Sequence, residues 1–164
     1  MTRGALRIVP LAAEHDRSTF ASGSAPLDGY FRQRVTQDIR RRDAACFVAI
    51  APDDRVAGYY TLASASLALA TLPPETARKL PRYPTIPAFR LGRLAVDKVF
   101  RGQGLGGAML ADALARAVRS EIAAFTMTVD AKDETASTFY LHHGFIPLPD
   151  SPMTLFLPLA TVSP

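Results

Sequence analysis

The feature that most constrains this chain is a glycine-rich junction between an apolar segment and an amphipathic one. The segment Phe89–Val96 has strand character, and a short turn then leads into a helix predicted to begin near Gly104. Glycines at positions 102, 104, 106 and 107 remove Cβ atoms where this helix starts. Free N–H groups, the positive end of the helix dipole and the Arg101 guanidinium would then suit a pyrophosphate. The junction therefore predicts a nucleotide-derived cofactor.

The bulk composition indicates an ordinary globular protein. With 164 residues, 48% hydrophobic and 21% charged, the sequence predicts a single domain over residues 1–164. No apolar run approaches the roughly 20 residues that a membrane span needs, and no signal-peptide pattern begins the chain. Cys46 is the only cysteine, which excludes an internal disulfide and a cysteine-rich zinc site, and it is expected to be buried. We therefore expect a cytoplasmic protein with neither a metal nor a membrane partner.

Positive charge gathers in two places, although the net charge is only +4. Residues 78–101 carry seven basic side chains against Asp97 alone, so this segment has a net charge of +6 and the rest of the chain −2. A second cluster of five arginines lies within residues 30–42, with Asp38 as its only acid. Either cluster could be a solvated arginine-rich face. Near a cofactor site, however, such charge indicates a polyanionic partner.

Hydrophobic periodicity predicts a mixed α/β order of elements. The second and third strands form a hairpin around the turn APDDR, and Gly144 is expected to close the last helix. Five prolines between residues 73 and 87 predict a constrained loop before the central strand. The predicted strands are 5–9, 45–50, 56–64, 89–96, 125–129, 145–148 and 153–157, and the predicted helices are 24–42, 74–80, 104–119 and 132–143.

Two cofactor templates fit the glycines. Gly102 to Gly107 satisfies the dinucleotide fingerprint G-x-G-x-x-G, and Asp130 follows at a strand end, as that fingerprint requires. However, the fingerprint normally follows its strand directly, whereas Asp97–Arg101 intervenes here, and too few residues remain for further βα units. The dinucleotide interpretation is therefore disfavoured.

The second template is the acyl-CoA site of the GNAT N-acetyltransferases. The run RGQGLG resembles that family's [Q/R]-x-x-G-x-[G/A] turn, and LAVDKVFRGQGLG resembles the strand and turn around it. About 35 residues downstream, AKDETASTFYLHHGF is similar to the family's second signature, a helix with an aromatic pair before a glycine and a final hairpin. This resemblance implies acetyl-CoA as the acetyl donor. It also implies a central, mostly antiparallel sheet that splits between two strands to admit the pantetheine.

Segments outside the shared site resemble one branch of this family, the tRNA-acetylating toxins encoded beside ribbon-helix-helix antitoxins. They are PLAAEHDRSTFASGSAPLDGYFRQRVTQDIRRRDAACFVAI, VAGYYTLASASL and TLFLPL. The branch implies that the acceptor is the α-amino group of an aminoacyl-tRNA and that the product cannot serve in elongation. It also implies an antitoxin of the ribbon-helix-helix type as partner, and it allows a homodimer.

The resemblance assigns roles to particular residues. Tyr140, on the aromatic helix, is expected to donate a proton to the departing thiolate. Ser137 lies one turn earlier and would reach the pantetheine. The residues implied in acetyl-CoA binding are Leu94, Ala95, Val96, Arg101, Gly102, Gln103, Gly104, Leu105, Gly106, Gly107, Ser137 and Phe139.

The central strand carries no carboxylate to act as a general base, whereas many family members carry a glutamate there. A lysine amine has a pKa of about 10.4 and needs such a base, whereas an α-amine, at about 7.7–8.0, is already partly neutral. This favours an α-amino acceptor. We expect Arg90 and Arg93, brought to one side by a bulge at Gly92, to meet phosphates of the tRNA acceptor end, with Arg78 and Lys79 as outer contacts.

Two other functions remain open. One is acetylation of a small amine or of a protein N-terminus. The other, of a different class, is a regulatory protein that holds acetyl-CoA without turnover or joins its antitoxin on DNA. Turnover with charged tRNA would separate an enzyme from a binding protein.

Overall fold

The computed structural model describes residues 6–162, which form two compact units. The first unit comprises the chain up to Ala63 together with Gly92–Ala113, and the second comprises Ser64–Leu91 together with the chain from Leu114 onward. Strands β3 and β4 each continue from one unit into the other, and the strand order is β1-β2-β3-β4-β5-β7-β6. The mixed α/β class predicted from the sequence is confirmed. No helix between residues 6 and 162 is long and apolar enough to cross a bilayer.

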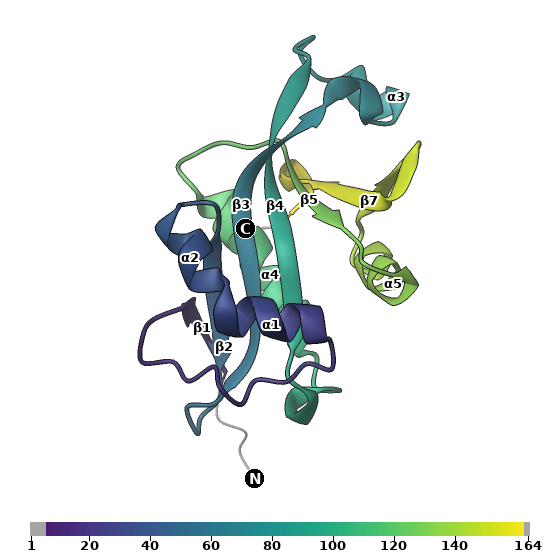
Figure 1. Ribbon diagram of the computed structural model, residues 1–164. Helices are drawn as coiled ribbons and strands as arrows, with labels where there is room; N and C mark the ends of the chain where they lie inside the picture. The colour runs from purple at the N-terminus through teal and green to yellow at the C-terminus, as the bar shows by residue number, and fades with distance from the viewer. Residues whose placement is uncertain (1–5, 163–164) are drawn as a thin grey trace. The chain divides into compact units, whose positions relative to one another are not determined.

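The first unit contains the predicted hairpin (Figure 1). Strand β2 pairs antiparallel with β3 on one side and with β1 on the other. Side chains from the loop before α1, from α1 and from β3 form its core: the rings of Phe31 and Tyr59 stack at 4.2 Å, and Phe20 meets both edge-on. Cys46 is buried in the same cluster, as expected. The elements are β1 (Arg7–Pro10), α1 (Ala25–Gln33), α2 (Val35–Arg40), β2 (Ala45–Ile50), the first part of β3 (Val56–Ala68), the end of β4 (Thr85–Val96), the 3-10 turn η2 (Lys98–Phe100) and the start of α4 (Leu105–Arg119).

The single helix predicted over residues 24–42 is wrong in one respect, because the structure divides it at Arg34 into α1 and α2. Arg34 has φ −120° and ψ −28°, outside the helical region, and its N–H still donates to the Tyr30 carbonyl at 2.9 Å. The start of α1 is as predicted, since the Ser24 hydroxyl accepts a hydrogen bond from the Leu27 N–H. Arginine itself is a good helix former, and only the β-branched pair Val35-Thr36 directly after it disfavours a continuous helix.

In the second unit, β5 (Thr126–Asp130) lies between β4 and β7 (Ser151–Pro158). The β4–β5 pairing is parallel and covers only Ala88–Leu91 against Thr126–Val129, and its end at Leu91 agrees with the predicted split of the sheet. The other pairings described here are antiparallel. The remaining elements are η1 (Leu69–Thr71), α3 (Pro74–Ala77), α5 (Glu134–His142), β6 (Ile146–Leu148) and η3 (Leu159–Thr161).

The proline-rich loop before the central strand is shorter than predicted. Strand β4 begins at Thr85 and includes Pro87, which the sequence placed in the loop. A proline has no N–H to donate to a ladder, but its carbonyl still accepts: Phe125 N–H donates to Pro87 O at 3.0 Å. Ile86 and Ala88 on either side are buried in the apolar cluster of this unit, so packing stabilises the strand there.

Candidate functional site

The glycine-rich turn in the first unit is held at its start by the buried carboxylate of Asp97. This carboxylate accepts hydrogen bonds from the N–H groups of Ala21 (3.0 Å) and Val99 (2.9 Å). The backbone adds two more bonds, from the Asp97 N–H to Ala57 O at 2.8 Å and from the Lys98 N–H to Ala21 O at 2.9 Å. The turn is therefore fixed to β3 and to the loop before α1, and the exposed residues that follow start from a rigid base.

The glycines in this turn adopt a conformation that few other residues accept. Gly102 and Gly104 have φ of +75° and +76°, and a Cβ at either position would point into open space. Residues 101–104 are exposed, and α4 begins at Leu105. Within residues 6–162, no acceptor is found for the N–H groups of Gly102 to Gly107. Such a helix start presents donors and a positive dipole end, as the sequence predicted, and it fits a pyrophosphate.

The Arg101 side chain already has a partner. One of its guanidinium nitrogens donates to the carbonyl oxygen of Ser22, in the loop before α1. Ser22 is itself held by Asp28, whose carboxylate accepts hydrogen bonds from the Ser22 N–H (3.0 Å) and hydroxyl (2.7 Å). A guanidinium has five N–H groups, so this bond leaves others for an anion. Arg101 thus links the loop before α1 to the turn, in addition to its predicted role.

Helix α4, whose first residues belong to the turn, packs directly on bare backbone of β3. A Cβ on Gly58 would come within 2.8 Å of Met109 Cε and 2.9 Å of the Ala95 carbonyl oxygen. Two residues further along β3, the Tyr60 hydroxyl donates to the Asp112 carboxylate of α4. These contacts set the position of the helix, and sequence reasoning missed them because the partners are far apart in the chain.

The residues of the strand, the turn and the helix start that were predicted to bind the cofactor differ in their exposure. Ala95 and Leu105 are buried, and Ala95 belongs to the apolar core of the first unit. Leu94 and Val96 are half-buried, as are Gly106 and Gly107. Gln103 is exposed. The side chains of Ala95 and Leu105 are therefore used in packing, and only the backbone groups of these two residues can contact a ligand.

Tyr140 lies on α5 in the second unit, and its side chain is 8% exposed. Its ring meets Phe139 at 5.2 Å and Phe145 at 5.4 Å, both edge-on. Burial raises the pKa of the Tyr140 phenol to about 12, so the group keeps its proton at neutral pH. Ser137, one turn earlier, is also buried, and the Asp133 carboxylate caps the helix by accepting from the Ala136 N–H at 2.8 Å.

The four basic residues predicted to contact tRNA are in different surroundings. Arg78, Lys79 and Arg90, in the second unit, are exposed. Arg93, in the first unit, is half-buried, and its guanidinium carbon lies 3.5 Å from the centre of the Tyr30 ring. The Tyr30 hydroxyl in turn donates to the Asp38 carboxylate at 2.7 Å. The Arg93 side chain is therefore partly engaged in packing. The bulge at Gly92 stays a prediction.

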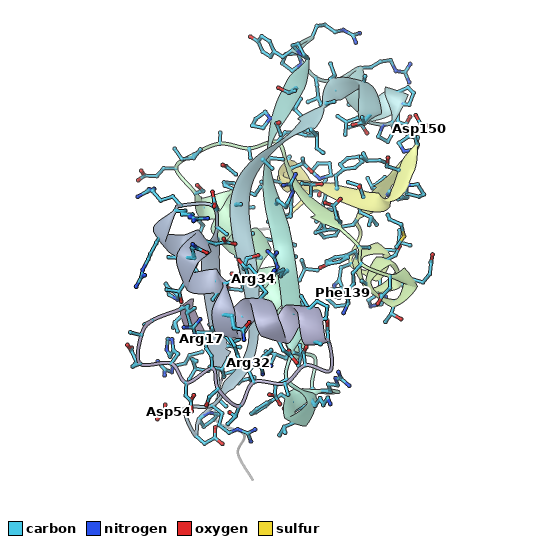
Figure 2. All side chains as sticks on the ribbon, in the orientation of Figure 1. Arg17, Arg32, Arg34, Asp54, Phe139 and Asp150 are labelled. Carbon is cyan, nitrogen blue, oxygen red and sulfur yellow. The ribbon has the colours of Figure 1, made fainter. Side chains whose placement is uncertain are left out.

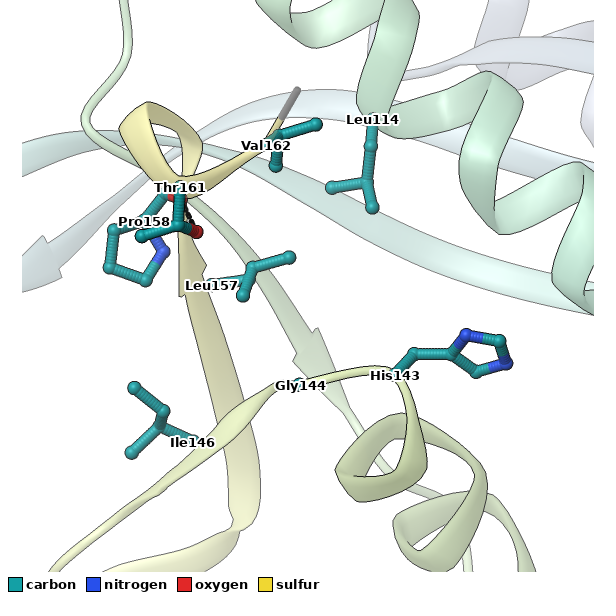
Figure 3. Close-up of a pocket in the computed structure, with 8 residues that line it drawn as sticks. All are labelled: Leu114, His143, Gly144, Ile146, Leu157, Pro158, Thr161 and Val162. Carbon is teal, nitrogen blue, oxygen red and sulfur yellow. Dashed lines mark hydrogen bonds between the residues drawn. The ribbon is translucent and has the colours of Figure 1, made fainter. Parts of the chain in front are cut away.

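An apolar hollow of about 500 Å³ lies elsewhere in the second unit (Figure 3). It is lined by Leu114 of α4, by His143 and Gly144 after α5, and by residues of β6, β7 and the end of the 3-10 turn η3. Gly144 has φ +92° and closes α5, as predicted. None of the predicted site residues lines this hollow. Among the described residues, no group of three or more His, Cys, Asp or Glu side chains is placed to hold a metal.

Comparison with known proteins adds to this geometry. A family model described as an acetyltransferase (GNAT) domain matches residues 28–154. A curated relative from Mycobacterium tuberculosis, named tRNA-acetylating toxin, is 38% identical over 144 residues, which cover 87% of this chain and 85% of the relative. A solved structure of AtaT complexed with acetyl-methionyl-tRNAfMet has a TM-score of 0.88 and 31% identity over 96% of both chains. A mutant AtaT toxin bound to the C-terminus of the antitoxin AtaR and to acetyl-CoA has a TM-score of 0.80 and 27% identity over 95% of this chain and 94% of that one.

Proposed function

Because this chain belongs to the acetyltransferase (GNAT) family, we propose that it transfers the acetyl group of acetyl-CoA to the α-amino group of an aminoacyl-tRNA. The observation that carries the proposal is the turn at residues 101–107, where exposed donors at a helix start suit the pyrophosphate of coenzyme A. The choice of acceptor is supported by the relatives, one of which is named for tRNA acetylation and another solved with an acetylated aminoacyl-tRNA. The family match extends over parts of both units, which supports one acetyltransferase domain over residues 1–164.

We assign the binding of acetyl-CoA to the strand and turn residues together with Ser137 and Phe139. The backbone N–H groups of the turn would hold the pyrophosphate, with Arg101 as an additional donor. Bound acetyl-CoA supplies an acetyl group activated as a thioester. Leu94, Ala95 and Val96 would offer backbone groups along the strand, while Gly102 and Gly104 keep side chains out of the way.

In this proposal Tyr140 is the general acid. The neutral α-amine attacks the thioester carbonyl, a C–N bond forms, the C–S bond breaks, and the amine loses one proton to solvent while the sulfur gains one from the Tyr140 hydroxyl. The raised pKa of Tyr140 keeps the phenol protonated at neutral pH, but it also makes the phenol a weaker acid than a thiol of pKa about 8.5, so the site must assist the proton transfer. The same burial that holds the proton also disfavours the phenolate, so Tyr140 must be reprotonated promptly after each turnover.

An acetylated α-amine can no longer attack a peptidyl ester, so the product cannot enter elongation and translation stops. We therefore place the protein among the toxins of toxin–antitoxin pairs, acting in the cytoplasm, where charged tRNA is found. The antitoxin bound in the AtaR complex supports a partner of this kind. That the partner is of the ribbon-helix-helix type, and that the toxin forms a homodimer, are parts of the proposal.

The test is transfer of radiolabelled acetyl from acetyl-CoA to a pool of charged tRNA. We expect label in the tRNA fraction that mild alkali releases as N-acetyl amino acids, and none in deacylated tRNA. Tyr140→Phe should lower kcat by about 10²–10⁴-fold, the usual contribution of a general acid, and leave acetyl-CoA binding unchanged. Label found only on small amines or on protein N-termini would overturn the choice of acceptor.

A further inference from the structure

The end of α2 carries a group of arginines that the proposed site does not use. Arg34, Arg40, Arg41 and Arg42 are all exposed, and we name them the α2 arginine cluster. Arg34 precedes α2, Arg40 is its last residue, and Arg41 and Arg42 follow it. Val35 and Ile39 of the same helix pack in the core of the first unit. The cluster is therefore a group of exposed side chains on and beside a short helix that its apolar residues hold in place.

These arginines differ from the other arginines nearby. Arg17 and Arg32, labelled in Figure 2, are held by the fold: Arg17 donates to Phe31 O at 2.8 Å and Arg32 donates to Phe20 O at 2.6 Å. No comparable partner is found for the cluster in the part of the chain that the structure describes. The acid closest in sequence on α2, Asp38, already accepts the Tyr30 hydroxyl at 2.7 Å. The four exposed side chains are therefore available to an external anion.

Arg42 adds an independent observation, because its backbone is in the left-handed region with φ +62°. Arg42 N–H donates to Ile39 O at 3.1 Å and Asp43 N–H donates to Asp38 O at 2.9 Å, which is the Schellman pattern that ends many helices. Glycine is the usual residue at this position, since a side chain there is disfavoured. Asp54, which also has positive φ, is a residue type that tolerates that conformation in turns. An arginine at the glycine position indicates a requirement other than folding.

We propose that the α2 arginine cluster binds phosphates of the tRNA backbone. The inference rests on the proposed function and adds to it a contact surface outside the predicted residues Arg78, Lys79, Arg90 and Arg93. Arginine suits phosphate because its planar fork donates two parallel hydrogen bonds. Three consecutive arginines at a helix end project in different directions, which suits a run of phosphates better than a single carboxylate. Contacts of this kind carry no sequence information, so the surface would serve any tRNA.

The first experiment uses the salt dependence of tRNA binding. Removing one arginine–phosphate pair lowers the slope of log K against log salt by about one. Arg40→Gln/Arg41→Gln should therefore lower that slope by about two, so that between 50 and 200 mM KCl the wild type loses roughly tenfold more affinity than the variant. The matched control Arg7→Gln/Arg119→Gln removes the same charge from other exposed positions and should keep the wild-type slope. An unchanged slope in the cluster variant would overturn the proposal.

The second experiment separates binding from folding. Arg42→Gly removes the left-handed strain, so it should raise the thermal midpoint and at the same time weaken tRNA binding. A variant that is more stable and binds tRNA as well as the wild type would contradict the proposal. Weaker binding together with a lower midpoint would also contradict it, because the reduced affinity would then follow from damage to the fold.

A third measurement distinguishes the failure of this inference from the failure of the proposed function. Binding of uncharged tRNA, followed by filter retention, reports on the cluster whether or not the enzyme acetylates tRNA. Acetylation of an aminoacylated trinucleotide that lacks the duplex reports on the chemistry, and Arg40→Gln/Arg41→Gln should leave its kcat/KM unchanged. If this variant slowed the trinucleotide reaction as much as the tRNA reaction, the cluster would belong to the catalytic site and the proposal would be wrong.

Discussion

At the scale of single residues, burial governs Tyr140. Removing the phenol from water destabilises the charged phenolate more than the neutral phenol, and this raises its pKa. Burial also raises the pKa values of Tyr30 and Tyr59, and for Tyr30 the hydrogen bond to Asp38 adds to the effect. These tyrosines therefore make the free energy of unfolding depend on pH in the alkaline range, because in the unfolded chain each would ionise near its ordinary pKa of about 10.

We predict that Tyr140→Phe flattens the alkaline limb of the stability profile. A folded-state pKa above the unfolded value gives stability that is complete below about pH 10 and lost as pH rises toward 12. The free energy of unfolding should fall by about 1.4 kcal/mol per pH unit for each such tyrosine. Urea unfolding of wild type and variant between pH 8 and 11 measures the difference. Parallel profiles above pH 10 would show that Tyr140 is not desolvated in the folded protein.

Substitutions at Arg90 and Arg93 should both weaken tRNA acetylation, but only the substitution at Arg93 should also lower stability. Arg90 is exposed, so Arg90→Ala should change stability by less than about 0.5 kcal/mol while weakening tRNA acetylation. Arg93 lies on the Tyr30 ring, and Arg93→Ala should cost about 0.5–2 kcal/mol of stability as well. Denaturant midpoints and kcat/KM for charged tRNA measure both effects, and neither variant should alter acetyl-CoA affinity. Equal loss of acetyl-CoA binding would place these arginines at the donor site instead.

At the scale of elements, the position of α4 depends on a glycine in another element. Gly58 lets the helix approach the backbone of β3, whereas Gly29, inside α1, has no neighbour within 4 Å of a Cβ. Replacing glycine by alanine should therefore change stability in opposite directions at the two positions.

We predict that Gly58→Ala destabilises the protein by about 1–3 kcal/mol, because Met109 and the Ala95 carbonyl must shift. The affinity for acetyl-CoA should fall with it, since the helix start carries the proposed pyrophosphate site. Gly29→Ala should instead stabilise by about 0.5–1 kcal/mol, as alanine is the better helix former. Chemical denaturation compares the two variants. If Gly58→Ala left stability unchanged or raised it, the tight contact at Gly58 would be disproved.

At the scale of the whole molecule, binding of acetyl-CoA should stabilise the folded state. At a concentration of 100 times Kd, a ligand adds about 2.7 kcal/mol, which for a chain of this size raises the thermal midpoint by roughly 5–10 °C. Differential scanning fluorimetry with acetyl-CoA measures this shift, and NAD at the same concentration serves as the control. A shift with NAD and none with acetyl-CoA would restore the dinucleotide interpretation of the glycine-rich turn.

The sequence was most informative where a local backbone conformation requires a particular residue type, such as glycine at a helix end. Gly104 and Gly144 were expected at helix ends and have positive φ there, and the hairpin around APDDR was marked by its turn residues. It was least informative where the structure depends on contacts between residues far apart in the chain. The Tyr60–Asp112 contact joins residues 52 positions apart, and the helix break falls at Arg34, which is itself a good helix former. Pro87 indicated a loop locally, yet tertiary packing made the segment a strand.

The division of the chain into interleaved segments has a consequence for synthesis. The first unit needs residues near both position 60 and position 110, and β5 in the second unit obtains its antiparallel partner only when β7, which ends at Pro158, has left the ribosome. A nascent chain that stalls earlier would carry the Tyr140 helix on an unpartnered sheet edge. The sheet of the second unit would thus be completed only after β7 has been made, and shorter chains would be expected to lack acetyltransferase activity.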